Sequence, residues 1–126
     1  IINIINNARD AVSTKEEKLI FINTNIEHGK YVIEILDNGG GISTEIINRI
    51  FEPYFTTKHQ SVGTGLGLSF AYNILTRYHN ATFKVENKKF KFEDNSHKGV
   101  CFKILITKKE KITKNSFHID FDKMAF

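Results

Sequence analysis

The chain has 126 residues and a mass of 14.5 kDa, which suits one domain with a modest core and argues against a second independent domain. Hydrophobic residues make up 40% and charged residues 25%, close to the globular average, so neither a disordered nor a fibrous chain is indicated. The formal charge is +4, but five of the 18 basic residues lie from Lys108 onward, too weak and local a surplus to indicate nucleic-acid binding. No apolar run approaches the roughly 18 residues of a membrane-spanning helix. Because a single cysteine, Cys101, suits a reducing compartment, we expect a cytoplasmic location.

The first 12 residues predict an amphipathic helix, because their apolar side chains recur at helical spacing: Ile1, Ile4, Ile5, Ala8 and Val12. The sequence opens within this pattern, without a capping residue ahead of it, so we expect a fragment of a longer protein. Residues 18–27 and 30–37 are alternating, β-branched stretches joined by His28 and Gly29. They predict an antiparallel hairpin whose second strand ends at Asp37.

The rest of the predicted domain, 1–107, combines helices and strands. A glycine loop at 38–41 leads to a predicted helix that begins at Ser43 and stops before Pro53. Residues 54–64 lack periodicity and predict a loop, and 66–78 predict a helix that packs on the sheet. Residues 82–87 and 99–107 predict two further strands, with a short extra strand expected around Phe90 and Phe92. The charged tail, 108–126, indicates no function.

Two asparagines in the first helix are candidate metal ligands. Asn3 and Asn7 are four residues apart and therefore lie on one helical face. An amide oxygen is a hard, neutral ligand that suits Mg²⁺, which keeps most of its waters and bridges phosphate oxygens. In isolation, such a pair in an Asn-rich chain is more often two solvent-facing side chains.

A carboxylate followed by glycines is a candidate base-binding site. Asp37 stands at a strand end, and the glycines that follow it would let a planar ring approach the backbone closely. Its carboxylate can accept a hydrogen bond from the amino group of adenine, whereas guanine would offer a repelling carbonyl oxygen. Taken alone, the segment also fits a tight turn with a capping aspartate.

Glycines at 63, 65 and 67 precede the second long helix. The first N–H groups of a helix have no internal partner, so such a terminus can bind phosphate. Lys58, in the loop just before, could balance the charge of a terminal phosphate, although a lone loop lysine is more often simply solvated. The glycine spacing matches neither GxxxxGK[ST] nor GxGxxG, which disfavours P-loop and Rossmann sites.

Four segments in order, NIINNARDA at 3–11, DNGGG at 37–41, FEPYFTTK at 51–58 and GTGLGLS at 63–69, resemble the N box, first glycine box, F box and second glycine box of the histidine-kinase catalytic domain (HATPase_c), a branch of the GHKL superfamily. The resemblance covers roughly residues 1–107. It implies a two-layer α/β sandwich of the Bergerat type, with a mixed, mostly antiparallel sheet covered by helices on one face. ATP and Mg²⁺ are the cofactors that it implies.

The resemblance assigns site residues by position. Asn7 would be the Mg²⁺ ligand, with Asn3 one turn earlier at the same site, and Asp37 would bind adenine. Asn3, Asn7 and Lys58 would form the catalytic set. The nucleotide-binding set that it implies is Asn7, Asp37, Gly39, Gly41, Ile42, Phe51, Phe55, Thr57, Lys58, Gly63, Thr64, Gly65, Leu66, Gly67 and Leu68.

The position of Asn3 separates the possible activities. In the hydrolases of this superfamily a glutamate one turn before the Mg²⁺ asparagine activates water, and Asn3 cannot accept a proton near neutral pH. The resemblance therefore implies a kinase that positions Mg·ATP for phosphoryl transfer to a histidine on a separate, preceding dimerisation domain. It implies a response regulator as partner and a dimeric parent protein, and it leaves membrane anchoring of the parent open. An anti-sigma-type serine kinase and a non-catalytic nucleotide-binding module are the alternatives.

Three features depart from the family pattern. The family carries an edge strand ahead of the N box, and because the sequence opens at this box we expect that strand to be missing from the fragment. Asp10 stands where many relatives carry a phosphate-binding lysine, and the stretch 88–98 is longer and more charged than the usual connection.

Overall fold

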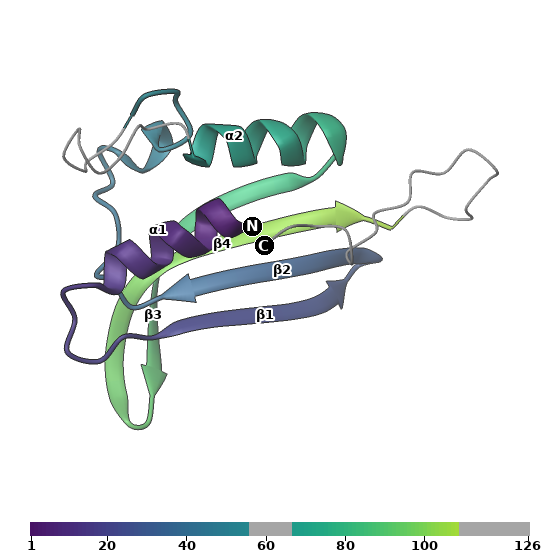
Figure 1. Cartoon of the computed structure of the whole chain (residues 1–126). Coiled ribbons are helices and arrows are strands. Elements are labelled where there is room, and N and C mark those ends of the chain that lie inside the picture. The colour runs from purple at the N-terminus through teal and green to yellow at the C-terminus, as the bar shows by residue number, and fades with distance from the viewer. Residues whose placement is uncertain (56–66, 109–126) are drawn as a thin grey trace.

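The computed structural model describes residues 1–55 and 67–108, which form a two-layer α/β sandwich. The two layers are a sheet of four strands and the helices α1 (Ile2–Val12) and α2 (Gly67–Asn73), which pack on one of its faces. In Figure 1, α2 runs along the top of the view and α1 crosses in front of the sheet. A π-helical segment, η2 (Ile74–Tyr78), continues α2, and a short 3-10 helix, η1 (Ile47–Arg49), precedes it. The predicted fold class is confirmed. Among the described helices, none has the length and apolar character needed to cross a bilayer.

The sheet consists of β1 (Ile20–Glu27), β2 (Lys30–Asp37), β4 (Asn95–Thr107) and β3 (Thr82–Phe92), in that spatial order. All three pairings are antiparallel, so the parallel component of the predicted mixed sheet is not found within the described residues. β1 and β2 form the predicted hairpin at His28 and Gly29, whose φ values of 50° and 75° fit a tight turn that twists with its strands.

The core lies between the helices and the upper face of the sheet. Ile35 of β2 pairs with Phe102 of β4, which pairs with Val85 of β3, so these three side chains share a face. The spacing of Ile4 and Ala8 places both on the side of α1 that faces the sheet, as the sequence predicted. The buried cluster consists of Ile4, Ala8, Ile35, Ile50, Ala71, Ala81, Phe83, Val100, Phe102 and Ile104.

The prediction of a helix from Ser43 to Pro53 is wrong, because this segment folds as a series of tight turns around η1. Most of its backbone bonds join residues three apart, such as the N–H of Arg49 to the carbonyl of Ile46 at 2.8 Å. The segment is bounded by Gly40 and Gly41, which adopt positive φ, and by Pro53, which disfavours helical backbone at the residue before it. Its apolar side chains still reach the core, where Ile50 is buried.

The prediction of a separate short strand around residues 88–98 is also wrong. β3 and β4 run on without a break and turn at Glu93 and Asp94, whose φ values are 48° and 64°. The alternation of Phe90 and Phe92 continues the period of β3, and both rings pack edge-on against Phe21 of β1. The stretch is therefore the distal half of one long hairpin, which curves below the sheet in Figure 1.

Candidate functional site

One face of α1 connects the two glycine segments. Asn3, near the start of the helix, donates its Nδ2 to the carbonyl of Gly67 at 3.1 Å. Ala11, eight residues further on, lies so close to Gly39 that an added Cβ there would be 2.6 Å from the Cβ of Ala11. Asn7 lies between them and is half-buried. Since the helix rises about 1.5 Å per residue, the two contacts are about 12 Å apart, with Asn7 near the midpoint.

Asp37 is the most buried polar side chain of the site, with 2% exposure. Its Oδ1 accepts hydrogen bonds from the N–H of Gly39 at 2.8 Å and from the N–H of Val100 at 3.2 Å. Burial raises the pKa of this carboxyl above its ordinary value, and the two backbone hydrogen bonds partly oppose that rise. The same oxygen, Oδ1, accepts both of these hydrogen bonds.

Close backbone approach fixes the position of Asp37. Gly99, at the point where β4 passes the end of β2, would clash with the carbonyl oxygen of Asp37 if it carried a Cβ. Only glycine therefore lets β4 approach closely enough for the N–H of Val100 to reach the Asp37 carboxylate. The sequence indicated Gly99 only as the entrance to a strand and did not predict this role.

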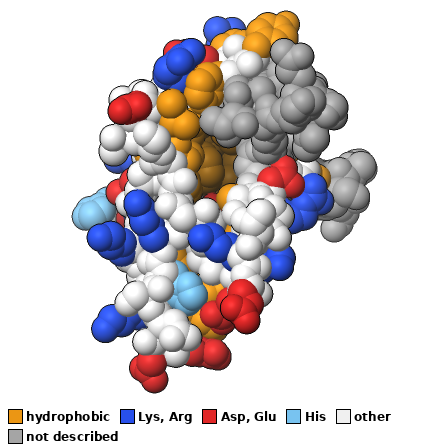
Figure 2. All heavy atoms as spheres, turned by 90° about the vertical axis from the view of Figure 1, so that its left-hand side faces the viewer, with side chains coloured by type: hydrophobic (Ala, Val, Ile, Leu, Met, Phe, Trp, Pro, Cys, Tyr) orange, Lys and Arg blue, Asp and Glu red, His pale blue; other side chains and the backbone are white. Residues whose placement is uncertain are grey.

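The loop that follows Asp37 bends through Gly40 and Gly41, with φ values of 100° and 91° that favour glycine. Lys15 Nζ lies 3.7 Å from where a Cβ on Gly40 would be, so a basic group flanks the loop. Figure 2 shows this side of the molecule, where α1 ends and β2 ends: the surface is hollowed over a hydrophobic floor, with Lys and Arg side chains around it.

The remaining described side chains of the predicted nucleotide set are partly buried and pack against the core. Phe51 stacks on Tyr72 of α2 at 4.9 Å between ring centroids, and the guanidinium of Arg49 lies 4.7 Å from the centre of the Phe55 ring. Ile42 and Leu68 are partly buried against the core. Thr57, Lys58, Gly63, Thr64, Gly65 and Leu66 lie outside the described residues.

Two polar side chains at the site were not predicted from the sequence. Asn87 of β3 pairs with the backbone of Ile42, and Asn38 bonds to the backbone of Glu17 and Leu19. Asn87 could have been noticed, because it is a polar residue on the same alternating face as Phe83 and Val85. Asn38 gave no such signal, because asparagine is common in loops.

Known proteins with similar sequences are ATPases and sensor kinases. Residues 1–110 match the family described as histidine kinase-, DNA gyrase B-, and HSP90-like ATPase. The chain is 38% identical to sporulation kinase A of Bacillus subtilis over 108 residues, which are 86% of this chain and 16% of that protein. It is 41% identical to the two-component sensor PprA of Pseudomonas aeruginosa over 81 residues, which are 60% of this chain and 9% of that protein. The chain thus spans only a small part of these relatives.

Solved structures agree with the sequence matches. The nucleotide-free catalytic domain of histidine kinase ThkA superposes with a TM-score of 0.65 and 34% identity, covering 84% of this chain and 62% of that one. The mycobacterial sensor histidine kinase MprB, at 20% identity and a TM-score of 0.65, shares the fold over 83% of this chain and 65% of that one. The chain therefore belongs to the histidine kinase-, DNA gyrase B- and HSP90-like ATPase family, as an ATP-binding domain of the sensor histidine kinase type.

Proposed function

We propose that this domain binds Mg·ATP along the Asn3–Asn7–Ala11 face of α1 and presents the γ-phosphoryl group to a histidine of another domain. The observation that carries the proposal is that this face contacts a glycine segment at each end, Gly67 at one end and Gly39 at the other. The buried Asp37 carboxylate lies beside Gly39. In this arrangement the base lies at the Asp37 end and the phosphates lie toward Gly67. The family supplies ATP as the nucleotide.

Asp37 selects the base. Its Oδ2 accepts a hydrogen bond from the exocyclic amino group of adenine, while Gly39 N–H and Val100 N–H hold Oδ1 in place. A hydrogen bond to a charged, desolvated acceptor is among the stronger ones in proteins. Guanine presents a carbonyl oxygen at the corresponding position, so this carboxylate repels it.

Asn7 holds the cation by its amide oxygen. Within residues 1–55 and 67–108, no three His, Cys, Asp or Glu side chains gather so as to hold a metal by themselves. An amide oxygen suits Mg²⁺, which binds through few protein ligands together with phosphate oxygens and waters. When bound, the ion neutralises charge that develops on the phosphates.

Asn3 acts in positioning rather than as a base. Its Nδ2 is committed to the Gly67 carbonyl, and its amide oxygen has negligible basicity near neutral pH. A glutamate here would place a carboxylate against that carbonyl. The side chain therefore ties α1 to the start of α2 and does not activate water.

The chemistry proposed is transfer, not hydrolysis. A nitrogen of the acceptor imidazole attacks the γ-phosphorus, the bond to the β,γ-bridging oxygen breaks, and ADP leaves. The domain contributes positioning and charge neutralisation, the main catalytic terms in phosphoryl transfer. We propose that Lys58 assists at the terminal phosphate, and that Thr57, Gly63, Thr64, Gly65 and Leu66 complete the nucleotide site.

The partners follow from this assignment. The relatives include a two-component sensor, a sporulation kinase and C4-dicarboxylate transport sensors. We infer that the acceptor histidine belongs to a dimerisation domain of the same full-length protein, and that a response regulator receives the phosphoryl group from it. A cytoplasmic location of this domain belongs to the same proposal.

The test is a phosphotransfer assay with radiolabelled ATP and a separately supplied histidine-bearing helical hairpin from a related sensor kinase. We expect acid-labile, alkali-stable label on the hairpin, lost when its histidine is replaced by alanine. Label on serine would indicate the serine-kinase alternative. ATP binding without transfer to either acceptor would indicate a non-catalytic nucleotide-binding module.

A further inference from the structure

The loop that carries the proposed base site has little stiffness of its own. Residues 38–42 connect β2 to the turns around η1, and the adjacent Gly40 and Gly41 both adopt positive φ. Glycines sample many backbone conformations, so the covalent chain does not keep this loop open. Its shape must come from contacts with neighbouring elements.

Asn87 of β3 provides the most specific of these contacts. Its Oδ1 accepts the N–H of Ile42 at 2.7 Å, and its Nδ2 donates to the carbonyl of Ile42 at 2.6 Å. The side-chain amide thus pairs with the loop backbone as a neighbouring strand would. A Cβ on Gly41 would lie 2.8 Å from Oδ1, so this pairing also needs glycine beside it.

β4 holds the loop from the adjoining strand. The carbonyl of Lys98 accepts the N–H of Gly40 at 2.9 Å, and the N–H of Val100 binds the Asp37 carboxylate. Because β3 and β4 pair directly, Asn87 lying opposite Val100, these contacts come from one rigid hairpin. Positions 37, 40 and 42 are all bonded to it.

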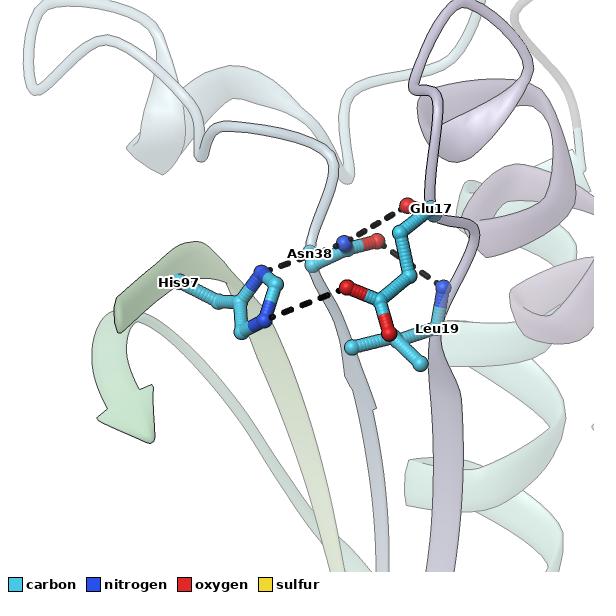
Figure 3. A network of polar contacts seen from close by, with 4 residues as sticks. All are labelled: Glu17, Leu19, Asn38 and His97. Atoms are coloured by element: carbon cyan, nitrogen blue, oxygen red, sulfur yellow. Dashed lines mark hydrogen bonds and ion pairs between the residues drawn. The ribbon is translucent and has the colours of Figure 1, made fainter. Parts of the chain in front are cut away.

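The distal half of the same hairpin reaches the other end of the loop. Figure 3 shows Asn38 between the hairpin and the chain that enters β1: its Oδ1 accepts the N–H of Leu19 at 3.0 Å and its Nδ2 donates to the carbonyl of Glu17 at 2.9 Å. His97 Nδ1 is 3.4 Å from that Nδ2, its Nε2 is 3.8 Å from the carboxylate of Glu17, and its ring stacks on Phe90 at 5.5 Å. The long hairpin thereby extends the support of the loop to residue 38.

We propose that the extended β3–β4 hairpin positions the base-binding loop, and that Asn87 is its principal positioning residue. The inference rests on the proposed ATP site and assigns a role to a segment that the nucleotide itself need not touch. Without Asn87 the loop populates other conformations, and apparent affinity falls by the fraction of time spent in the competent one. Loss of two hydrogen bonds predicts ATP binding weaker by about tenfold.

The test combines calorimetric ATP titration with amide hydrogen exchange on the 126-residue chain and its Asn87→Ala variant. The Gly40 amide is the informative probe, because its acceptor, Lys98, is untouched by the substitution. We expect about tenfold weaker ATP binding and about tenfold faster exchange at Gly40, with protection restored at saturating ATP. A purely local loss of stability would not be reversed by the ligand in this way.

Two further variants serve as controls. Asn87→Asp keeps the volume of the side chain and the acceptor for the Ile42 N–H but loses the donor to the Ile42 carbonyl. It therefore serves as the test if the alanine variant does not fold. We expect it to bind ATP at least threefold more weakly. Asn23→Ala, on the exposed face of β1, should leave both measurements unchanged. A folded Asn87 variant with ATP affinity within twofold of the unmodified chain and unchanged Gly40 exchange would overturn the inference. No ATP binding by the unmodified chain would instead refute the proposed function. Gly40 exchange in the free protein would then still test whether Asn87 positions the loop.

Discussion

Replacing Asp37 by asparagine separates what this residue does for ATP from what it does for the fold. In the unmodified protein, Oδ1 accepts hydrogen bonds from the N–H groups of Gly39 and Val100 at 2.8 and 3.2 Å. The side-chain oxygen of the variant can still accept both. The other position becomes an amide donor and faces the donor amino group of adenine. A hydrogen bond to a charged acceptor is worth about 1.5–3 kcal/mol, which predicts about 10- to 150-fold weaker ATP binding.

The same substitution should not destabilise the nucleotide-free protein. Burial raises the pKa of Asp37, so the folded state keeps its proton to higher pH than the unfolded state, where the pKa is about 3.9. The contribution of Asp37 to the free energy of unfolding therefore falls as pH rises from its unfolded-state pKa to its folded-state pKa. Above the folded-state pKa, the whole desolvation penalty of the charged carboxylate is present. Asparagine does not titrate, so the variant should be at least as stable at pH 7, and its advantage should disappear below about pH 3.9.

The assay is isothermal calorimetry with ATP and GTP, together with thermal unfolding between pH 3 and 7. We expect the unmodified chain to prefer ATP and the variant to lose that preference without a lower melting temperature at pH 7. If the variant bound ATP as tightly as the unmodified chain, Asp37 would not contact the base. If the variant melted markedly lower at pH 7, the charged carboxylate would stabilise the nucleotide-free fold. The argument that its burial destabilises this fold would then be wrong.

Further predictions concern the cation, the close backbone approach and the Asn38 contacts. Asn7→Ala should abolish the Mg²⁺ dependence of ATP binding measured by calorimetry, whereas Asn3→Ala should keep it; equal behaviour of the two would contradict the assignment of the ligand. Gly99→Ala should displace Asp37 because its Cβ overlaps the Asp37 carbonyl, lowering the free energy of unfolding by at least about 1–3 kcal/mol in urea titrations and weakening ATP binding; a stable variant with full affinity would refute the requirement for glycine. Asn38→Ala, which removes a side chain with 5% exposure and two hydrogen bonds to backbone, should cost about 1–3 kcal/mol by the same measurement, and an unchanged midpoint would show that water replaces those bonds.

The elements that the sequence predicted correctly are those whose local signals agree with their tertiary context. The apolar spacing of Ile4 and Ala8 matches the buried face of α1, and His28-Gly29 supplies the positive φ values of a tight hairpin turn. Asp37 was placed at a strand end by the length of the alternating run before it. In these places propensity, pattern and packing point to the same structure.

The two wrong predictions, a helix from Ser43 and a separate strand around residues 88–98, depend on tertiary contacts that override the local sequence pattern. Residues 43–51 have helical spacing, yet their backbone forms turns and the 3-10 helix η1, and Ile50 still reaches the core. The pairing of β3 and β4 continues as far as Phe92 and Asn95. It is supported by the rings of Phe90 and Phe92, which pack against Phe21, a residue distant in the sequence. Contacts of this kind depend on the assembled sheet, so the alternation at 88–92 alone could not distinguish a longer strand from a separate one.

The partners of the polar side chains that shape the site could not be predicted from the sequence. Asn87 and Ile42 are 45 residues apart, and Gly99 and Asp37 are 62 positions apart in the numbering, so their proximity follows from the strand order β1-β2-β4-β3. The family resemblance assigned candidate ligand-binding residues, which belong to short motifs, and their contact with a ligand stays a prediction. It did not place the residues that support them from β3 and β4.

The most direct test of the central claim is a crystal structure of the chain with a non-hydrolysable ATP analogue and Mn²⁺, which is located by its anomalous signal. We predict that the adenine amino group lies about 3 Å from Asp37 Oδ2, with the cation on the amide oxygen of Asn7 and the phosphates between α1 and the start of α2. A base bound elsewhere, or a cation held without Asn7, would contradict the proposed site.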